Sequence, residues 1–440
     1  MKVIVLGAGV IGVSTAYYLA KSGHEVIVLE KSSASSRGCS FANGGQLSYS
    51  HIDTWSNKSA LWAMAKSLIM PQQTHINIQD FSNRDFYKWL FNFIKNSATN
   101  LSLTNSEKIS AISNLSKLLM HEFIESESSS MGLDRQSFTK NFSYKDNGIL
   151  HFYKNKKTFD NDVARLKKLD HLNINHAILN PEECLEIEPL LRNLHNQKKL
   201  YGGIYFGDDA SGDCHKFTQF LEKICREKYG VKFLFDCEIR NILTNYEKIT
   251  GINTSQEVMV ADKYVYCMGA SGLSLLSGIG INPAIYPVKG YSLSVKCSES
   301  FKSLNIALTD SENKIFYSKL NNVIRVAGTI EMNGFNNNIN PKNINFLENN
   351  FFNIFGEYLE ADNALKWCGF RPFRANSVPL IGNVNQLKNL YLNSGHGSLG
   401  WTQSLASGKI IDDLITTNKT HNLDFLSAEF TNIFKGRPLN

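Results

Sequence analysis

The sequence has 440 residues, of which 42% are hydrophobic and 20% are charged. A chain of this length is expected to fold as two or three domains with packed cores, since single domains seldom exceed about 250 residues. The net charge of +6 is small for this size, and no run of Lys and Arg forms a basic stripe. We therefore expect no nucleic-acid partner.

No apolar run reaches the roughly 20 residues that a membrane-spanning helix needs. The first residues, MKVIVLGAGVIG, are predicted to be a strand and turn of the fold, and we expect no cleaved segment before them. The eight cysteines are scattered and form no CxxC pair. We expect reduced thiols, most of them buried as small hydrophobic side chains, in a cytoplasmic protein.

The beginning of the chain has the pattern of a βαβ unit. Residues 2–6 (KVIVL) form a β-branched run typical of a buried parallel strand, and GAGVIG follows at once over residues 7–12. A helix is predicted from there to Gly23, a natural C-cap, and the second strand, HEVIVLE, ends in Glu30. A G-x-G-x-x-G turn in this context, with an acidic residue at the end of the next strand, predicts dinucleotide binding.

Each part of this unit has a physical role. Gly7 allows the tight turn out of the strand, Gly9 lets a pyrophosphate approach the backbone, and Gly12 lets the helix pack closely on the strand. The helix N-terminus presents free N–H groups and the positive end of its dipole to the phosphates. Glu30 is placed to accept hydrogen bonds from the hydroxyls of the adenosine ribose.

The unit alone does not distinguish NAD from FAD, because both cofactors use it. The segment RGCSFANGGQLS, residues 37–48, is a second loop of small residues just after the second strand, where a helix normally follows in a nicotinamide-dependent dehydrogenase. A long loop of this kind suits an extended FAD, whose ribityl chain and flavin need close backbone approach. We therefore predict FAD as the cofactor.

Residues 55–145 are predicted to be largely helical. Within them, RDFYKWLFNFIK at residues 84–95 is densely aromatic, with a cationic residue at each end. This segment has two interpretations. It is either a helix packed on the core, or a patch that faces a membrane surface or a quinone.

Later segments return to the dinucleotide-binding pattern. A loop leads into an amphipathic helix over residues 210–230, one strand is predicted over residues 231–242, and a hairpin precedes a strand ending in Gly269. Residues 286–368 are β-rich and are predicted to form the sheet of a second domain. Near the end, LYLNSGHGSLGWT is predicted to be a strand and a glycine turn, followed by the helix QSLASGKIIDDLI.

Six blocks of sequence carry a family likeness: VIVLGAGVIGVSTAYYL, ANGGQLS, SGDCHKFTQ, YPVKGYSLS, GFRP with VPLIG, and LNSGHGSLGWT. They occur in the family's order from one end of the chain to the other. The chain resembles the FAD-dependent D-amino acid oxidase and glycine oxidase superfamily. Within it, the sequence is most similar to the bacterial small subunit of D-amino acid dehydrogenase.

The resemblance implies an α/β fold with a discontinuous Rossmann-type FAD-binding domain and an α+β substrate domain, whose mixed or antiparallel sheet lies over the flavin. We assign residues 1–50, 205–285 and 369–440 to the FAD-binding domain. Residues 51–204 and 286–368 are assigned to the substrate domain.

The resemblance also implies which residues contact FAD. Those for the ADP half are Val3, Leu6, Gly7, Ala8, Gly9, Val10, Ile11, Gly12, Glu30 and Lys31. Those along the flavin and near the phosphates are Asn43, Gly44, Gly45, Gln46, Leu47 and Gly269. Those of the wall beside the isoalloxazine are Gly395, Gly397, Ser398, Leu399, Gly400 and Thr402. No covalent flavin link is expected, because this last block has no cysteine.

Arg371 matches the family arginine that pairs with the substrate carboxylate. A guanidinium binds a carboxylate through two hydrogen bonds and so fixes the direction of the Cα–H bond. The alternative is an ion pair at the surface or between domains. The apolar context WCGFRPF disfavours a free surface position.

Three further candidates have open roles. His396 is either a structural imidazole or a contact to flavin or substrate, and no metal is expected because no other ligand stands at metal spacing. Tyr291 and Tyr317 either line the substrate pocket or pack in the core, and Lys289 could lie above the flavin. With Arg371, the residues Tyr291 and His396 are our catalytic candidates.

One segment departs from the family pattern. In FRANSVPLIG, Asn376 stands where the family usually has an aspartate, and Ser377 where it usually has a glycine. Asn keeps the turn geometry but loses the charge, which puts one local hydrogen-bond network in doubt. Arg371 is unaffected.

The implied reaction is the oxidative deamination of a D-amino acid such as D-alanine. Hydride passes from Cα to flavin N5, and the imino acid hydrolyses to a 2-oxo acid and ammonia. The electrons would go to a quinone or another membrane-linked acceptor, with the protein cytoplasmic or peripheral on the inner face of the cell membrane. Two alternatives share these motifs: an O2-using oxidase of the D-amino acid, glycine or sarcosine type, and a catalytically silent FAD-binding subunit.

Overall fold

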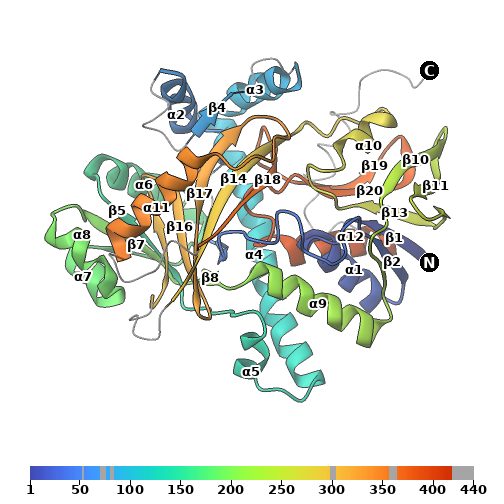
Figure 1. Cartoon of the computed structure of the whole chain (residues 1–440), viewed down its shortest axis with the longest axis horizontal. Helices are drawn as coiled ribbons and strands as arrows, with labels where there is room; N and C mark the ends of the chain where they lie inside the picture. The colour runs from blue at the N-terminus through green and yellow to red at the C-terminus, as the bar shows by residue number, and fades with distance from the viewer. Residues whose placement is uncertain (52–53, 70–75, 80–83, 298–303, 356–363, 419–440) are drawn as a thin grey trace.

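The computed structural model describes residues 1–51, 54–69, 76–79, 84–297, 304–355 and 364–418. Within them the chain forms two large sheets, one in each half of the molecule (Figure 1). Two smaller sheets accompany them, one of three strands and one that pairs β3 (Gln46–Leu47) with β8 (Ala210–Ser211).

The smaller of the two large sheets has the strand order β19–β20–β13–β1–β2–β9. Its strands run parallel, apart from the antiparallel edge strand β19. The strands β1 and β2 are buried on both faces, which explains their continuous β-branched runs. The bounds are β1 (Lys2–Leu6), β2 (Glu25–Leu29), β9 (Lys232–Leu234), β13 (Lys263–Tyr266), β19 (Leu380–Val384) and β20 (Leu387–Ser394).

Helices cover one face of this sheet: α1 (Val10–Lys21), α4 (Thr99–Ser130), α9 (Cys214–Tyr229) and α12 (Ser404–Thr416) (Figure 1). The buried Glu127 carboxylate on α4 joins three of them, because it accepts hydrogen bonds of 2.8 Å from both Tyr17 on α1 and Tyr229 on α9. The opposite face packs on α10 (Leu273–Gly278) and on the three-stranded sheet of β10 (Ile239–Asn245), β11 (Lys248–Thr254) and β12 (Val258–Met259).

The prediction of a single strand over residues 231–242 is wrong. The structure divides this stretch into β9 and β10, which belong to different sheets. Asp236, between them, has a φ of +52°, a left-handed conformation that ends an extended strand. The helix α1 ends next to the predicted glycine: its C-cap is Ser22, and Gly23 follows in the left-handed conformation with a φ of +85°.

The larger sheet has the order β18–β14–β17–β16–β15–β5–β7–β6, with β4 paired to β17. It is mixed, because β5 runs parallel to β15 and β4 runs parallel to β17, whereas the other pairs are antiparallel. The bounds are β4 (Ile76–Ile78), β5 (Ile149–Tyr153), β6 (His176–Leu179), β7 (Gly202–Phe206), β14 (Ile285–Lys296), β15 (Ala307–Asp310), β16 (Ile315–Leu320), β17 (Val323–Met332) and β18 (Leu365–Arg374).

The helix α11 (Pro341–Phe355), which packs on this sheet, was not predicted within the β-rich residues 286–368. Its apolar residues Ile344, Leu347 and Phe351 recur at helical spacing and are buried. The remaining helices of this half are α2 (Lys58–Ile69), α3 (Arg84–Asn96), α6 (Lys156–Lys168), α7 (Pro181–Ile187) and α8 (Arg192–Asn196), with short 3-10 turns at Asp170–Leu172 and Pro189–Leu191. The short helix α5 (Arg135–Lys140) instead packs on α4 and α9 in the core of the other half.

The predicted fold class, a parallel-sheet α/β unit joined to an α+β unit with a mixed sheet, is confirmed. The assignment of residues to two domains stays a prediction. Three strands of the larger sheet run across its boundaries, since β7 starts before residue 205, β14 starts before residue 286, and β18 continues past residue 369. Residues 419–440 of the predicted FAD-binding domain lie outside the described residues.

Candidate active site

A cavity of about 1050 Å³ lies between the two large sheets. One side is formed by the turn after β1, the end of β2, the loop of residues 37–48, and residues 393–402. The other side is formed by β14, β17 and β18 of the larger sheet. Its volume reaches the upper end of the range for ligand pockets, about 300–1,000 Å³, so it can hold a large ligand.

The glycine turn after β1 has the form predicted for a phosphate-binding turn. Gly7 has a φ of +100°, and a Cβ atom on Gly12 would lie 1.9 Å from the carbonyl oxygen of Gly7. Only glycine therefore fits at residue 12. Gly9 faces more open space, since its nearest neighbour would be Ser40 Oγ at 3.5 Å. The N–H of Val10, at the start of α1, donates to the same Ser40 Oγ at 3.1 Å.

Glu30 stands at the end of β2 and lines the cavity. One of its carboxylate oxygens accepts a hydrogen bond from the N–H of Ala8, and the other accepts one from the N–H of Ser32, both at 2.9 Å. Backbone donors therefore hold the carboxylate beside the glycine turn, where a ribose is expected.

The loop of residues 37–48 is held in place by side chains of the larger sheet. Arg325 on β17 donates to the carbonyl oxygen of Asn43 at 2.9 Å, and Ser318 on β16 donates to that of Gly44 at 2.8 Å. The amide of Gln46 donates to Leu308 on β15 at 2.9 Å. These contacts could not be predicted, because the partners are separated by more than 260 residues in the sequence.

The turn after β20 owes its glycines to packing as well as to conformation. Gly395 and Gly397 have φ values of +86° and +56°. A Cβ atom on Gly395 would lie 2.9 Å from the side chain of Arg374, and one on Gly397 would lie 2.9 Å from the ring of Phe373. These neighbours are on β18, so close approach of that strand, and not of a ligand alone, requires small residues here.

The structure brings most of the predicted cofactor residues to the cavity. Those that line it are Gly7, Gly9, Val10, Ile11, Glu30, Lys31, Asn43, Gly44, Gln46, Gly269, Gly397, Ser398, Leu399, Gly400 and Thr402. Those that do not are Val3, Leu6, Ala8, Gly12, Gly45, Leu47 and Gly395. For each residue, contact with FAD stays a prediction.

Arg371 on β18 reaches into the cavity from the larger sheet. Its Nη1 atom donates to the carbonyl oxygen of Thr329 at 3.3 Å, and its guanidinium lies over Gly290, where a Cβ atom would be 2.4 Å from Cζ. Among the described residues, no carboxylate lies within 4.0 Å of the guanidinium. Burial lowers the pKa of Arg371, and the neighbouring Cys39 opposes this shift only in part.

Tyr291 lines the cavity, but its hydroxyl donates to the Glu331 carboxylate at 2.8 Å. Lys289 does not line the cavity, and its ammonium forms a buried ion pair with Glu331 at 2.7 Å. The prediction that Lys289 lies above the flavin is therefore not supported by its position. Tyr317 packs in the hydrophobic core of the larger sheet, as one of its two interpretations required.

His396 lines the cavity and is only 3% exposed. Its Nε2 atom has no hydrogen-bond partner within the described part of the chain. Burial lowers the pKa of the imidazole to about 3, so the ring is neutral at physiological pH. A neutral imidazole with a free nitrogen at a cavity wall is suited to exchange one hydrogen bond with a bound ligand.

The described residues also bear on metal sites and membrane-spanning helices. No group of three or more His, Cys, Asp and Glu side chains in them could hold a metal ion. No helix among them is long and apolar enough to cross a membrane. All eight cysteines are free thiols, and five of them are buried, as expected for most.

Comparison with known proteins decides the family. The FAD dependent oxidoreductase family matches residues 2–414 of the chain. The chain belongs to that family. The predicted resemblance, the FAD cofactor and the assignment to the FAD-dependent oxidoreductases are thereby confirmed.

Similar sequences of this family cover nearly the whole chain. A D-amino acid dehydrogenase of Paramagnetospirillum magneticum is 34% identical over 416 residues, which are 94% of this chain and 95% of the relative. A D-amino acid dehydrogenase of Neisseria meningitidis is 34% identical over 422 residues, 96% of this chain and 97% of the relative.

Solved structures share the fold of this chain. Glycine oxidase from Bacillus cereus has a TM-score of 0.68 at 21% identity, with 96% of this chain and 97% of that chain covered. L-proline dehydrogenase from P. horikoshii has a TM-score of 0.70 at 18% identity, with 97% and 96% covered.

The cavity fits the cofactor of the family. The turn that excludes a side chain at Gly12 and the restrained carboxylate of Glu30 suit the ADP half of an FAD, and the volume of the cavity leaves room for the rest. The Nε2 atom of His396 has no partner among the described residues, so it is available at the cavity wall for a hydrogen bond with the flavin half of FAD.

Proposed function

We propose that this FAD-dependent oxidoreductase oxidises D-amino acids of the D-alanine type to 2-oxo acids and ammonia. The observation that carries the proposal is Arg371, a cation in the cavity for which no described residue supplies a carboxylate. An α-amino acid brings that anion. The relatives named D-amino acid dehydrogenase support this substrate class and its configuration.

The residues that would hold FAD divide into two groups. Gly7, Gly9 and Glu30 would hold the ADP half, and the segments of residues 43–47 and 395–402 would line the flavin. When bound, FAD supplies the two-electron acceptor for the hydrogen of the substrate Cα. The protein's part is to bind and orient the amino acid.

Arg371 binds the carboxylate and thereby orients the Cα–H bond. The guanidinium is preorganised before substrate binds. It donates a hydrogen bond to the carbonyl oxygen of Thr329 and packs against the backbone of Gly290, which has no side chain. Two hydrogen bonds to one carboxylate leave the substrate little rotational freedom. The direction of the Cα–H bond is then set by which enantiomer is bound.

The substrate amine is expected to react in its neutral form. The only carboxylates that line the cavity are Glu30 and Glu238, among the described residues, and both stand beside the smaller sheet, at the predicted ADP end. Neither is on β14, β17 or β18, where Arg371 lies. The described residues therefore place no carboxylate base beside the substrate, and the amine is expected to have lost its proton before the Cα–H bond breaks.

We propose a quinone or another membrane-linked compound as the electron acceptor, with the protein peripheral on the inner face of the cell membrane. Support comes from α2 and α3, which lie together at one edge of the molecule (Figure 1). The buried face of α3 packs on the core through Phe86, Trp89 and Phe93, in accord with one of its interpretations. The exposed apolar residues of the two helices are Trp62, Leu68, Ile69, Tyr87, Phe91 and Ile94.

Anaerobic reduction of the bound flavin by a panel of D- and L-amino acids tests the proposal. We expect D-alanine to bleach the flavin and L-alanine to leave it oxidised. Normal FAD binding without bleaching by any D-amino acid would favour the catalytically silent subunit instead. Steady formation of peroxide with D-alanine in air would favour the oxidase.

The membrane contact has its own test. Co-sedimentation with anionic lipid vesicles should be strong for the unmodified protein, and weakened by Trp62→Ser together with Phe91→Ser. The matched control is Tyr246→Ser, since Tyr246 is 93% exposed but lies in the turn between β10 and β11. Equal sedimentation of all three proteins would contradict a membrane contact at α2 and α3.

A further inference from the structure

The larger sheet contains a buried ion pair whose partners are all supplied by the protein. Lys289 on β14 and Glu331 on β17 are 1% and 2% exposed, and their side chains are 2.7 Å apart. The other oxygen of Glu331 accepts hydrogen bonds from Tyr291 at 2.8 Å, Asn343 at 2.9 Å and Asn340 at 3.1 Å. Although burial alone would raise the pKa of Glu331, these donors and Lys289 lower it, so the carboxylate stays charged.

The same pair holds the loop of residues 333–340, which connects β17 to α11. The Lys289 ammonium donates to the carbonyl oxygens of Asn336 at 2.9 Å and Asn338 at 3.0 Å. With the bond to Glu331, all three of its protons are used. Between these two carbonyls, that of Asn337 accepts a hydrogen bond from the Cys368 thiol on β18 at 3.4 Å. Three successive backbone carbonyls are thus fixed from beneath by side chains of the sheet.

The loop presents two side chains to the cavity, those of Phe335 and Asn337. The ring of Phe335 is 5.5 Å from that of Phe370, the residue before Arg371, in an edge-to-face arrangement. It is still 53% exposed, which leaves one face available for another apolar group. Trp367 also lines this end of the cavity, with its indole lying over Gly369, where a Cβ atom would be 2.1 Å away.

We propose that the loop of residues 333–340 forms the subsite for the substrate's side chain, with Phe335 as the residue that contacts it and with Lys289 and Glu331 as positioning residues. This inference rests on the proposed function, in which Arg371 binds the α-carboxylate. The subsite favours uncharged, apolar side chains, because Phe335, Phe370 and Trp367 offer rings. The charges of Lys289 and Glu331 neutralise each other within the sheet, and Arg371 is occupied by the α-carboxylate.

Binding of straight-chain carboxylates to the FAD-loaded, full-length protein tests the subsite without turnover. Acetate, propionate and butyrate are titrated and followed by the change in flavin absorbance. In the unmodified protein, affinity should rise about fourfold with each methylene group that becomes buried. In Phe335→Ala, acetate should bind as before, but the gain with chain length should be reduced to less than twofold per methylene.

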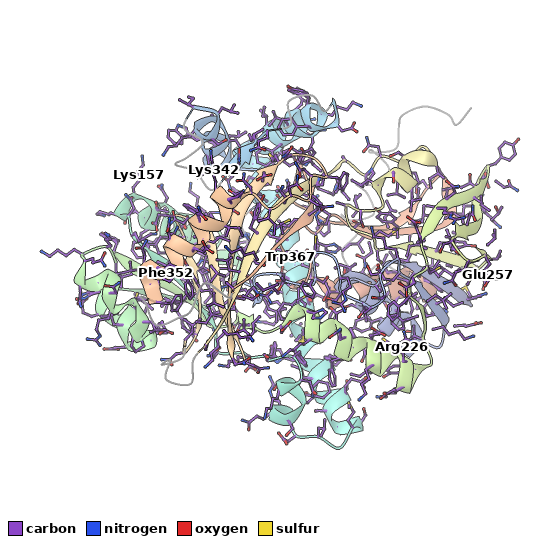
Figure 2. All side chains as sticks on the ribbon, viewed as in Figure 1. Lys157, Arg226, Glu257, Lys342, Phe352 and Trp367 are labelled. Atoms are coloured by element: carbon purple, nitrogen blue, oxygen red, sulfur yellow. The ribbon has the colours of Figure 1, made fainter. Side chains whose placement is uncertain are left out.

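The matched control is Phe352→Ala, because Phe352 is also exposed but belongs to α11, away from the cavity. Figure 2 shows it well to the side of Trp367. In this variant, affinity should rise with the chain length of the carboxylate as it does in the unmodified protein. If Phe335→Ala keeps it too, the loop does not form the subsite and the inference is wrong. If none of the carboxylates binds the unmodified protein, the carboxylate role of Arg371 fails, and this inference fails with it.

The positioning role is tested by the double variant Lys289→Met with Glu331→Gln, which removes both buried charges together. It should bind acetate normally but lose the gain with chain length, since the loop carbonyls are no longer held. If affinity in this variant still rises about fourfold with each methylene group, Lys289 and Glu331 do not have the positioning role. Phe335→Ala removes no buried charge, so its result decides the subsite even where the double variant does not fold.

Discussion

The Arg371 guanidinium and the Thr329 carbonyl oxygen are joined by a hydrogen bond of 3.3 Å, and Thr329 adopts a backbone conformation that a β-branched residue rarely takes, with a φ of +55°. The pairing of β14 with β17 explains it. Lys289 pairs with Glu331 and Tyr291 with Gly328, so two residues of β17 stand opposite Gly290 alone. This bulge turns the Thr329 carbonyl toward Arg371. Strain of this kind is found where function requires a fixed group.

Removal of the guanidinium should strongly weaken carboxylate binding. We expect Arg371→Ala to weaken the binding of D-alanine by roughly 2–4 kcal/mol, the loss expected for a charged pair with two hydrogen bonds. Arg371→Lys should recover only part of this, because an ammonium lacks the planar fork of donors. The KM for D-alanine measures the effect, with FAD content as the control. A normal KM in Arg371→Ala would refute the assignment.

Gly290→Ala should displace Arg371 without unfolding the protein. The new Cβ atom would lie 2.4 Å from Cζ of Arg371, but the clash is with the end of a flexible side chain, which can move aside. We expect an increase in KM of about tenfold, equivalent to ~1.4 kcal/mol, with little change in melting temperature. A decrease in melting temperature that accompanies the increase in KM would indicate that the backbone, and not Arg371, had shifted.

Gly12→Ala should prevent the retention of FAD. Alanine is favoured over glycine within a helix by about 1 kcal/mol, but here its Cβ atom would be 1.9 Å from a backbone oxygen, and backbone cannot move aside cheaply. We expect purified Gly12→Ala to carry little flavin by absorbance and to melt at a lower temperature. The control is Gly278→Ala at the end of α10, where a Cβ atom meets nothing within 4 Å.

His396 should make the folded protein sensitive to acid. Burial lowers the pKa of its imidazole to about 3, whereas an unfolded histidine titrates near 6.5. Between these values the unfolded chain binds a proton that the folded chain does not, so stability falls as pH falls from about 6.5. In His396→Asn, the free energy of unfolding in urea should fall less steeply over this range, by up to about 1.4 kcal/mol per pH unit. Identical slopes would contradict a buried neutral imidazole.

The features that were predicted well depend on residues that are close together in the sequence. A strand, a glycine turn and a helix follow one another directly between residues 2 and 23, so their geometry can be read locally. Gly12 was predicted from helix packing, and the structure gives the clash that requires it. Arg371 was predicted from an apolar context and a family match, and it does reach the cavity.

The features that were missed depend on pairing between distant strands. The bulge at Thr329 results from the pairing of β17 with Gly290 on β14. The residues next to Thr329 in the sequence do not predict its positive φ. Lys289 appeared to be a residue for the flavin because its partner Glu331 is 42 positions away, on a strand whose register could not be deduced. Gly395 appeared to be small for a ligand, whereas Arg374 occupies the space beside it.

The contacts from Arg325 to Asn43 and from Ser318 to Gly44 have a consequence for how the protein is made. A nascent chain presents the phosphate-binding turn almost as soon as it leaves the ribosome, but the side chains that hold the flavin loop emerge about 280 residues after that loop itself. The turn after β20 comes later still. Capture of FAD is therefore expected near the end of synthesis. Until then the apolar walls of the incomplete cavity are exposed, and the nascent chain has to avoid aggregation through them.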